Sequence, residues 1–199
     1  DKQLGLFIVA DGMGGHEGGE VASNIAVKTC QEIINSYKIT KVKVSPHQLI
    51  RECYTTASKK IYQKGQNENK ELKGMGTTMV MATLINGKLY IGNVGDSRCY
   101  LFRDNHLWQL TEDHSLVNEQ IRAGIISEDE VHMVSGKNVI TRSVGFEEVV
   151  DADIFQRKVE KGELYLLCSD GLCGMVDDSV IESILKNNDP RNAVNSCIE

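Results

Sequence analysis

Residues 4–20 read LGLFIVADGMGGHEGGE, the most informative stretch of this chain. An apolar strand runs directly into Asp11, and a carboxylate at the end of a strand can hold a metal ion. Gly12 follows at once, and glycine permits turns with positive φ and lets the backbone approach a ligand. The same design recurs at Asp170 and, in shifted form, at Asp96. The sequence therefore predicts three acids at the ends of three apolar strands.

Length and composition predict a single domain over residues 1–199, with 41% hydrophobic and 25% charged residues. A net charge of -6 argues against nucleic acid as the main partner, because binding to phosphates needs clustered Lys and Arg. No apolar run approaches the roughly 20 residues that cross a bilayer, so we expect no membrane contact. The six cysteines include no CxxC pair, and we expect reduced thiols in the cytoplasm.

Helical signals follow the first strand. Apolar residues recur at steps of three and four over residues 20–37, which predicts an amphipathic helix. Ser45 and Pro46 supply the N-cap and first-turn signals of a second helix. Residues 65–74 are polar and predict a loop.

Strand signals dominate the middle of the chain. Asn86-Gly87 separates two β-rich runs and predicts a type I′ hairpin, because both central residues of that turn need positive φ. A second hairpin is predicted around residues 103–106, and we expect the two hairpins to form one antiparallel meander.

The last third mixes both kinds of structure. Residues 111–145 contain a short helix ended by Gly124, and a capping box at Ser127 and Glu130. Two further strands are predicted at residues 152–158 and 163–168. Two further helices are predicted after the capping signals at Asp177 and Asp189. Strands and helices come in runs and do not alternate, which predicts an α+β layered fold.

Three carboxylates brought into one partly buried site would repel one another, and divalent cations relieve that repulsion. Oxygen ligands from Asp11, Asp96 and Asp170, with the Gly12 carbonyl, favour Mg²⁺ or Mn²⁺ over zinc. The alternative for each aspartate is that it merely begins a turn, as Asp before Gly often does.

Six strings occur together in one order and spacing: FIVADGMGGHEGGEVAS, GTT, IGNVGDSR, LTEDHS, ITRSVG and LLCSDGL. Together they resemble the metal-dependent type 2C protein Ser/Thr phosphatases, the PPM family, in their bacterial form, over nearly the whole chain. The resemblance implies an antiparallel β-sandwich flanked by antiparallel helix pairs, a four-layer αββα fold. It also implies an enzyme that hydrolyses phosphoserine and phosphothreonine in proteins with a hydroxide bridging two Mn²⁺ or Mg²⁺ ions.

The resemblance also assigns residues. It implies that Asp11 bridges two metals, that Gly12 lends its carbonyl, and that Asp170 holds the first metal, so that Asp11 and Asp170 serve catalysis. Asp96 would help to hold a third metal, although Gly174 stands where the family usually has a further acid for it. The partners it implies are phosphorylated proteins, targets of a Ser/Thr kinase in signalling, and we expect a monomer.

Histidines are open to two interpretations. Many relatives have a histidine two residues after the bridging aspartate, where this chain has Met13. His16 can take a proton role or make a structural hydrogen bond near the helix start, and we favour the second. His114, in the string LTEDHS, is interpreted as structural.

Two pieces of the family pattern are missing from this sequence. They are a preceding strand with a phosphate-binding arginine and a terminal strand pair with an Asp-Asn motif, so we expect a domain trimmed at both ends. The alternative to an enzyme is an inactive domain that binds phosphoproteins or serves as a regulatory module.

Overall fold

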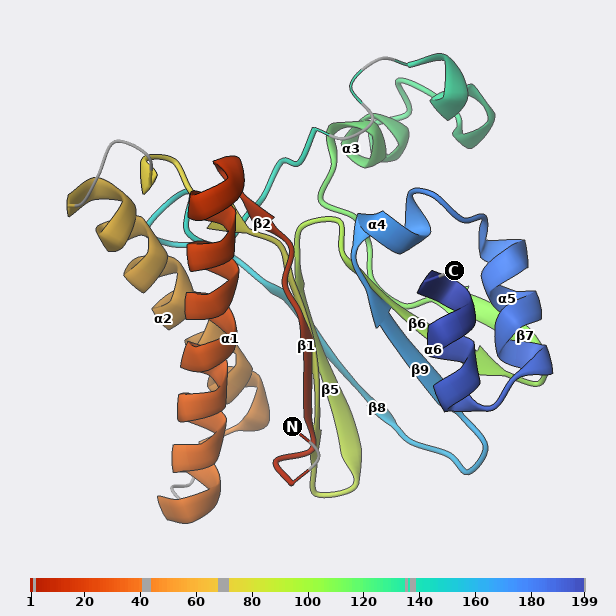
Figure 1. Cartoon of the computed structure of the whole chain (residues 1–199), viewed down its shortest axis with the longest axis horizontal. Helices are drawn as coiled ribbons and strands as arrows, with labels where there is room; N and C mark the ends of the chain where they lie inside the picture. The colour runs from red at the N-terminus through yellow and green to blue at the C-terminus, as the bar shows by residue number, and fades with distance from the viewer. Residues whose placement is uncertain (2, 41–43, 68–71, 135, 137–138, 199) are drawn as a thin grey trace.

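Two antiparallel sheets pack face to face at the centre of the molecule (Figure 1). The computed structural model describes residues 1, 3–40, 44–67, 72–134, 136 and 139–198. The strands of the first sheet, in spatial order, are β1 (Leu6–Val9), β4 (Met79–Ile85), β5 (Lys88–Val94) and β8 (Asp153–Lys158). Those of the second are β7 (His106–Gln109), β6 (Arg98–Arg103) and β9 (Leu164–Cys168). A short ribbon pairs β2 (Gly12–Met13) with β3 (Gly76–Thr77).

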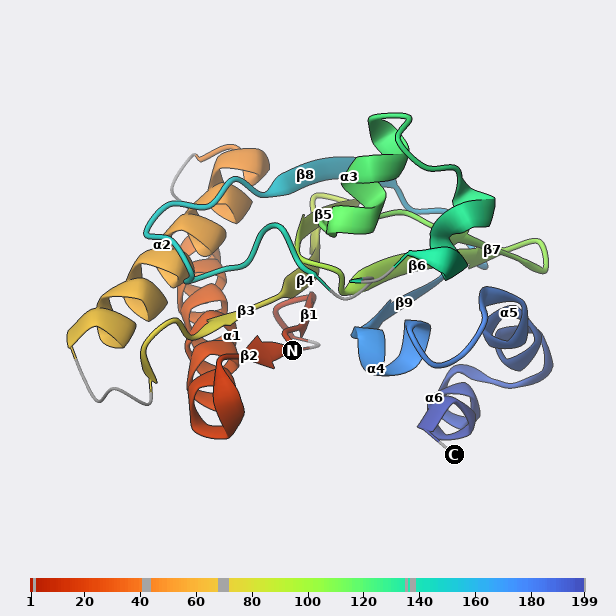
Figure 2. The same ribbon diagram turned by 90° about the horizontal axis from the view of Figure 1, so that it is seen from above.

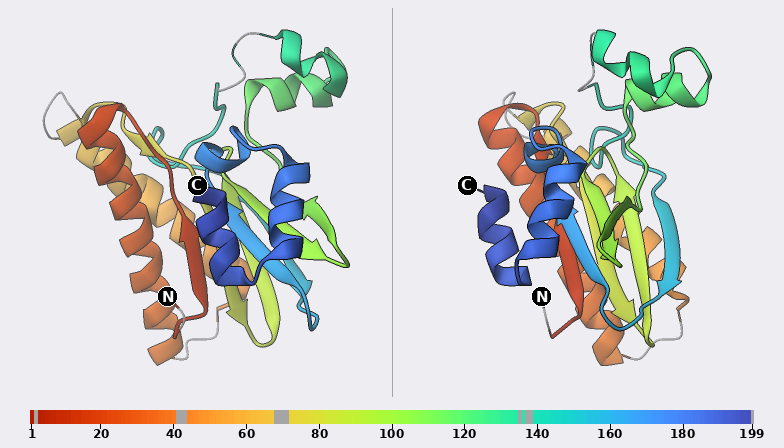
Figure 3. Two further views of the ribbon diagram at one scale, coloured as in Figure 1. Left: turned by 45° about the vertical axis from the view of Figure 1, so that its right-hand side comes forward. Right: turned by 90° about the vertical axis from the view of Figure 1, so that its right-hand side faces the viewer.

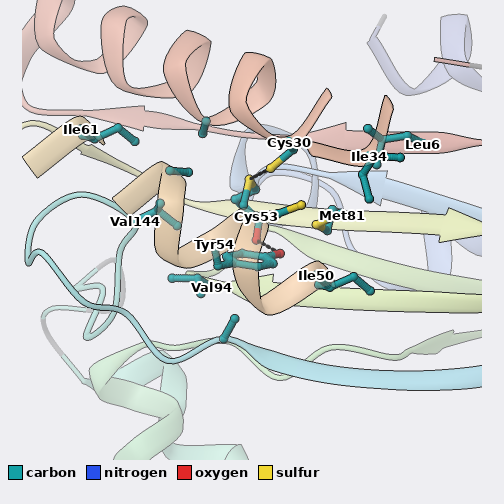
Figure 4. Packing of buried hydrophobic residues seen from close by; sticks show 14 of the residues in the cluster. Leu6, Cys30, Ile34, Ile50, Cys53, Tyr54, Ile61, Met81, Val94 and Val144 are labelled. Carbon is teal, nitrogen blue, oxygen red and sulfur yellow. Dashed lines mark hydrogen bonds between the residues drawn. The ribbon is translucent and has the colours of Figure 1, made fainter. Parts of the chain in front are cut away.

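Helices α1 (Gly15–Thr40) and α2 (Pro46–Asn67) cover the outer face of the first sheet (Figure 3). Their buried residues fall on the stripes predicted from the sequence, and Figure 4 shows them packed against the strands. The buried members are Ala22, Ala26, Cys30, Ile34, Leu49, Ile50, Cys53, Tyr54, Ala57 and Ile61. Ser45 caps α2 as predicted, because its hydroxyl accepts a hydrogen bond from the Gln48 amide at 3.2 Å.

The other two layers complete the predicted αββα order. Between the sheets lies a core that includes Val80, Ala82, Leu89, Ile91 and Cys99. Helices α5 (Asp178–Asn187) and α6 (Pro190–Ile198) pack on the outer face of the second sheet. The antiparallel sandwich flanked by helix pairs is therefore confirmed.

Strand β4 shows how the sequence pattern produces these layers. Met79 and Met81 pack under the helices, while Val80 and Ala82 face the second sheet. Successive side chains of a strand point to opposite faces, so residues 79–82, which are covered on both sides, are all apolar.

Both predicted hairpins form. Asn86 and Gly87 have φ of 51° and 75°, as a type I′ turn requires. Asp104 and Asn105 have φ of 52° and 63°, so the second turn is tighter than residues 103–106 suggested. The prediction of one continuous meander is wrong, because the chain crosses from the first sheet to the second between β5 and β6. The free edge of β5 pairs instead with β8, a partner far along the chain.

Helix boundaries differ from the prediction at two places. Helix α1 begins at Gly15, five positions before residue 20, because the glycine-rich start packs closely against the turn after Asp11. Helix α2 continues through residues 65–67, which were predicted as loop, while residues 68–71 of that loop lie outside the described residues.

The remaining elements agree with the sequence. The short helix α3 (Leu116–Arg122) is followed by Gly124 with φ of 70°. Ser127 and Glu130 form the predicted capping box at the start of the 3₁₀ helix η2 (Glu128–Met133), and α4 (Asp170–Cys173) is a single turn. All six cysteines are described, and all are free thiols. Among the described helices, none combines the length and apolar character needed to cross a membrane.

Replacing Gly92 with alanine tests the packing of α2 on β5. A Cβ atom at this position would lie 2.6 Å from Cε2 of Tyr54 and 3.0 Å from Cγ2 of Ile50. The Tyr54 ring cannot easily retreat, because its hydroxyl donates a hydrogen bond to the Met79 carbonyl at 3.0 Å. We expect Gly92→Ala to lower the free energy of unfolding by about 1–3 kcal/mol. Urea denaturation measures it, and a loss no larger than that of the control Lys88→Ala, on the exposed start of β5, would contradict this packing.

Candidate metal centre

Asp11 lies where β1 leaves the first sheet, and both its main-chain amide and its main-chain carbonyl are hydrogen-bonded. Its amide donates to Oγ1 of Thr78 at 3.0 Å. Its carbonyl accepts hydrogen bonds from the Thr78 amide and from Oγ1 of Thr77, both at 2.8 Å. Because both main-chain groups are tied to residues 77–78, the direction in which the Asp11 carboxyl leaves the sheet is fixed.

The glycines after Asp11 let this turn pack against the start of α1. A Cβ atom on Gly19 would lie 2.6 Å from the Gly12 carbonyl oxygen, and a Cβ on Gly12 would overlap the Gly19 backbone. Any larger residue at either position would force the turn and the helix apart.

Asp170 reaches the same place from the second sheet. It opens α4 directly after β9, and its carboxyl lies close enough to the Asp11 carboxyl to shift the pKa of Asp11. Burial first, and then this contact and the negative charge of Asp170, raise the pKa of Asp11, while a hydrogen bond with Ser169 opposes the shift. Two like charges are thus pressed together at the end of the sandwich.

Asp96 lies in the crossover between the sheets and faces this pair. Burial raises the pKa of Asp96 to about 6, with further contributions from the charges of Asp170, Asp113 and Asp11. In the described part of the chain, no three His, Cys, Asp or Glu side chains are grouped closely enough to hold an ion. Asp11 and Asp170 are therefore the close pair, and their charges contribute to the raised pKa of Asp96.

A hydroxyl pair joins the two turns that carry Asp11 and Asp96. Oγ1 of Thr78 lies 2.7 Å from Oγ of Ser97, and both side chains are buried. The motifs GTT and GDSR contain these residues, but nothing in their spacing predicts that the two hydroxyls meet. Thr78 is consequently the residue through which both turns are positioned.

His114 supports Asp96 from the other side. Its Nδ1 accepts the Gly95 amide at 3.1 Å, so the proton resides on Nε2, which lies 3.2 Å from Oδ2 of Asp153. The His114 amide also donates to the Gly95 carbonyl at 3.0 Å. Burial lowers the pKa of His114, and the Asp153 carboxylate opposes that shift. His114 is thus a buried neutral imidazole that positions the turn before Asp96.

A fourth acid near the site is already neutralised. Arg98 binds the Asp113 carboxylate with two nitrogens, Nε at 2.9 Å and Nη2 at 2.7 Å, and its Nη1 donates to the Tyr100 hydroxyl. This bidentate geometry is the strong form of an ion pair. Asp113 therefore differs from the three predicted site acids, which have no cationic partner among the described residues.

Gly174, where the family usually has an acid, lies beside Asp170. It ends α4, and a Cβ atom there would lie 2.7 Å from the Asp170 carbonyl oxygen. Asp178, near it in sequence, instead accepts a hydrogen bond from the Tyr100 hydroxyl at 2.9 Å. The side chain of His16 lies outside the described part of the molecule.

The donor set fits a hard divalent cation. The close pair consists of two carboxylates with a partly exposed opening, and cations that prefer oxygen ligands relieve repulsion between such groups. Asp11 and Asp170 are the residues that this arrangement offers as direct ligands.

Comparison with known proteins gives consistent results. The family described as Protein phosphatase 2C matches residues 1–189. Serine/threonine phosphatase stp of Listeria welshimeri is 40% identical over 185 residues, which cover 92% of this chain and 72% of that protein. The crystal structure of Mycobacterium tuberculosis serine/threonine phosphatase PstP/Ppp aligns with a TM-score of 0.88 at 30% identity, covering 97% of this chain and 80% of that one.

A second similar structure contains metal ions. It is the catalytic domain of the serine/threonine protein phosphatase PstP in complex with two manganese ions, with a TM-score of 0.83 and 30% identity. It covers 97% of this chain and 79% of that chain.

Thr78→Val tests whether this hydroxyl supports the site. Valine keeps the shape but leaves the Asp11 amide and the buried Ser97 hydroxyl without this partner. We expect the free energy of unfolding, measured in urea without metal, to fall by about 1–3 kcal/mol. The control is Thr55→Val on the surface of α2, where we expect a change within about 0.5 kcal/mol. Equal losses in both variants would contradict the assigned role.

His114→Asn tests the buried imidazole through pH. The unfolded chain takes up a proton near pH 6.5, whereas the folded His114 resists it because burial lowers its pKa. The unfolded state then binds more protons, so wild-type stability falls as pH drops through and below that value. We expect the stability difference between wild type and variant to be smaller at pH 5 than at pH 7.5. Denaturation at both pH values measures it, and a constant difference would refute the neutral, buried state.

Proposed function

The chain belongs to the protein phosphatase 2C family, and on that premise we propose that it hydrolyses phosphoserine and phosphothreonine in proteins with the help of divalent cations. The observation that carries the proposal is the contact between the Asp11 and Asp170 carboxyls, where burial and like charge together raise the pKa of Asp11. Relatives named as serine/threonine phosphatases support the same activity.

Asp11 and Asp170 would hold a pair of manganese or magnesium ions, with the Gly12 carbonyl as a further ligand and Asp96 contributing to a weaker third site. Two manganese ions in the PstP complex support the pair. When bound, such a pair of cations activates water for nucleophilic attack and offsets the charge that develops on the phosphoryl group.

The chain's own residues then orient the ligands. Thr78 holds the Asp11 main chain, and His114 holds the Gly95 amide, so neither acid-bearing turn has to reorganise when substrate arrives. Preorganised groups of this kind lower the cost of reaching the transition state. Cys168 and Cys173 have no role in this reaction, because the nucleophile is water and not a thiol.

The substrates we propose are targets of a Ser/Thr kinase, so that the protein reverses kinase signalling. We propose that it works as a monomer in the cytoplasm. Free thiols at all six cysteines support a reducing compartment.

Mn²⁺-dependent turnover of an aryl phosphate and of a phosphothreonine peptide tests the function. We expect Asp11→Asn to lower kcat/KM by at least about 100-fold on both substrates. Replacing a residue that only hydrogen-bonds to a metal ligand typically lowers activity by about 10- to 100-fold, and loss of a direct ligand should cost more. EDTA should abolish wild-type turnover, and added Mn²⁺ should restore it.

The matched control is Asp104→Asn, which neutralises an acid in the β6–β7 turn and should leave turnover unchanged. Turnover that survives EDTA, or that Asp11→Asn leaves intact, would contradict the enzyme. Metal-dependent binding of phosphopeptide without turnover would favour a regulatory binding module in its place.

A further inference from the structure

A cavity of about 500 Å³ opens beside the candidate metal centre, between the β2–β3 ribbon and the chain segment over residues 140–151. Figure 2, which looks onto this end of the sandwich, shows that segment running from the α3 region past β3 and α2 on its way to β8. Met13, Ile140, Phe146, Val149 and Val150 supply the apolar part of the lining. None of these residues has a role in the proposed chemistry.

Hydrogen bonds attach one wall of this cavity to Asp11. Thr77 and Val144 exchange two main-chain hydrogen bonds, at 2.9 and 2.8 Å. The Thr77 hydroxyl in turn donates to the Asp11 carbonyl. The segment is also anchored to α2, since Oγ of Ser58 accepts the Gly145 amide at 2.9 Å.

The other wall is attached to the Asp96 turn. Nη1 of Arg142, which lines the cavity, lies 3.0 Å from Oδ1 of Asp153, and Asp153 faces Nε2 of His114. His114 holds Gly95, the residue before Asp96. The cavity is therefore connected to both acid-bearing turns, and Met13, two residues after Asp11, lines it.

The chemical character of the cavity is amphipathic. Phe146 and Val149 are 64% and 73% exposed, which is high for large apolar side chains on one short segment. Glu147 and Asp151 also line the cavity, and within the described residues neither carboxylate has a hydrogen-bond or ion-pair partner. Arg142 is already paired with Asp153, so the cavity presents uncompensated negative charge beside apolar surface.

We propose that this cavity receives a lysine or arginine side chain of the phosphoprotein substrate, close in sequence to the phosphorylated residue. This inference rests on the proposed function. The aliphatic stem of such a side chain packs against Phe146 and Val149, while its cationic end faces Glu147 and Asp151. A purely apolar side chain would leave the two carboxylates without a cationic partner, and an acidic side chain would be repelled by them.

The test uses a short phosphothreonine peptide with one arginine placed in turn at each of the three positions on either side of the phosphothreonine. Each peptide has a twin with citrulline, which keeps the shape and loses the charge. Fluorescence anisotropy gives Kd, and Mn²⁺-dependent turnover gives KM and kcat. At one or more positions we expect the arginine peptide to have a Kd and KM about three- to tenfold lower than its twin, as two partly exposed ion pairs allow. The kcat should be equal within each pair.

The double variant Glu147→Gln, Asp151→Asn should remove this discrimination and leave aryl phosphate turnover at the wild-type level. The matched control Asp104→Asn, Glu160→Gln makes the same charge change around Arg103 and should keep the discrimination. Discrimination that is absent at every position, or that survives in the Glu147/Asp151 variant, would overturn the proposal. Equal preference for arginine in unphosphorylated peptides would also overturn it, because the cavity would then be a general basic docking surface.

Failure of the proposed function gives a different result. Aryl phosphate turnover would then be absent with Mn²⁺, while the Kd comparison, which needs no turnover, would still decide the cavity's preference.

Discussion

The fold holds the Asp11 and Asp170 carboxyls close together, and the geometry of the candidate metal centre follows from this. Each acid comes from a different sheet, Asp11 from the end of β1 and Asp170 from the end of β9. Their separation is therefore set by how the two sheets pack, through the core around Val80, Ile91 and Cys99. The fold brings together two like charges that would separate in an unfolded chain, and this cost is offset by packing and by any cation that binds them.

Buried polar groups keep this arrangement in place. Thr78 ties the Asp11 turn to Ser97, and His114 ties the Asp96 turn to Asp153. Such networks stabilise one geometry because each unpaired member would be costly in a low-dielectric interior. The cavity that we propose for a basic side chain depends on the same connections, since its two walls are attached to Thr77 and to Asp153.

Much of the fold could be predicted from local pattern. Helical spacing located the stripes of α1 and α2, and Asn86-Gly87 located a hairpin, because these features depend on neighbours in sequence. The crossover between sheets could not be predicted, since the pairing of β5 with β8 joins residues that are far apart in sequence. The same limit applies to the site. Neighbouring glycines identified Asp11, Asp96 and Asp170 as candidate ligands, whereas no sequence pattern predicts that the hydroxyls of Thr78 and Ser97 meet.

Asp170→Asn tests whether the two carboxyls repel each other, by urea denaturation of wild type and variant in EDTA and in Mn²⁺. If like charges are held together until a cation binds, the variant is more stable than wild type in EDTA, because asparagine removes the repulsion with Asp11. Mn²⁺ then stabilises wild type by mass action and has little effect on the variant. A variant that is less stable than wild type in EDTA, and that gains as much stability from Mn²⁺ as wild type does, would show that the two carboxyls neither repel each other nor bind the cation together.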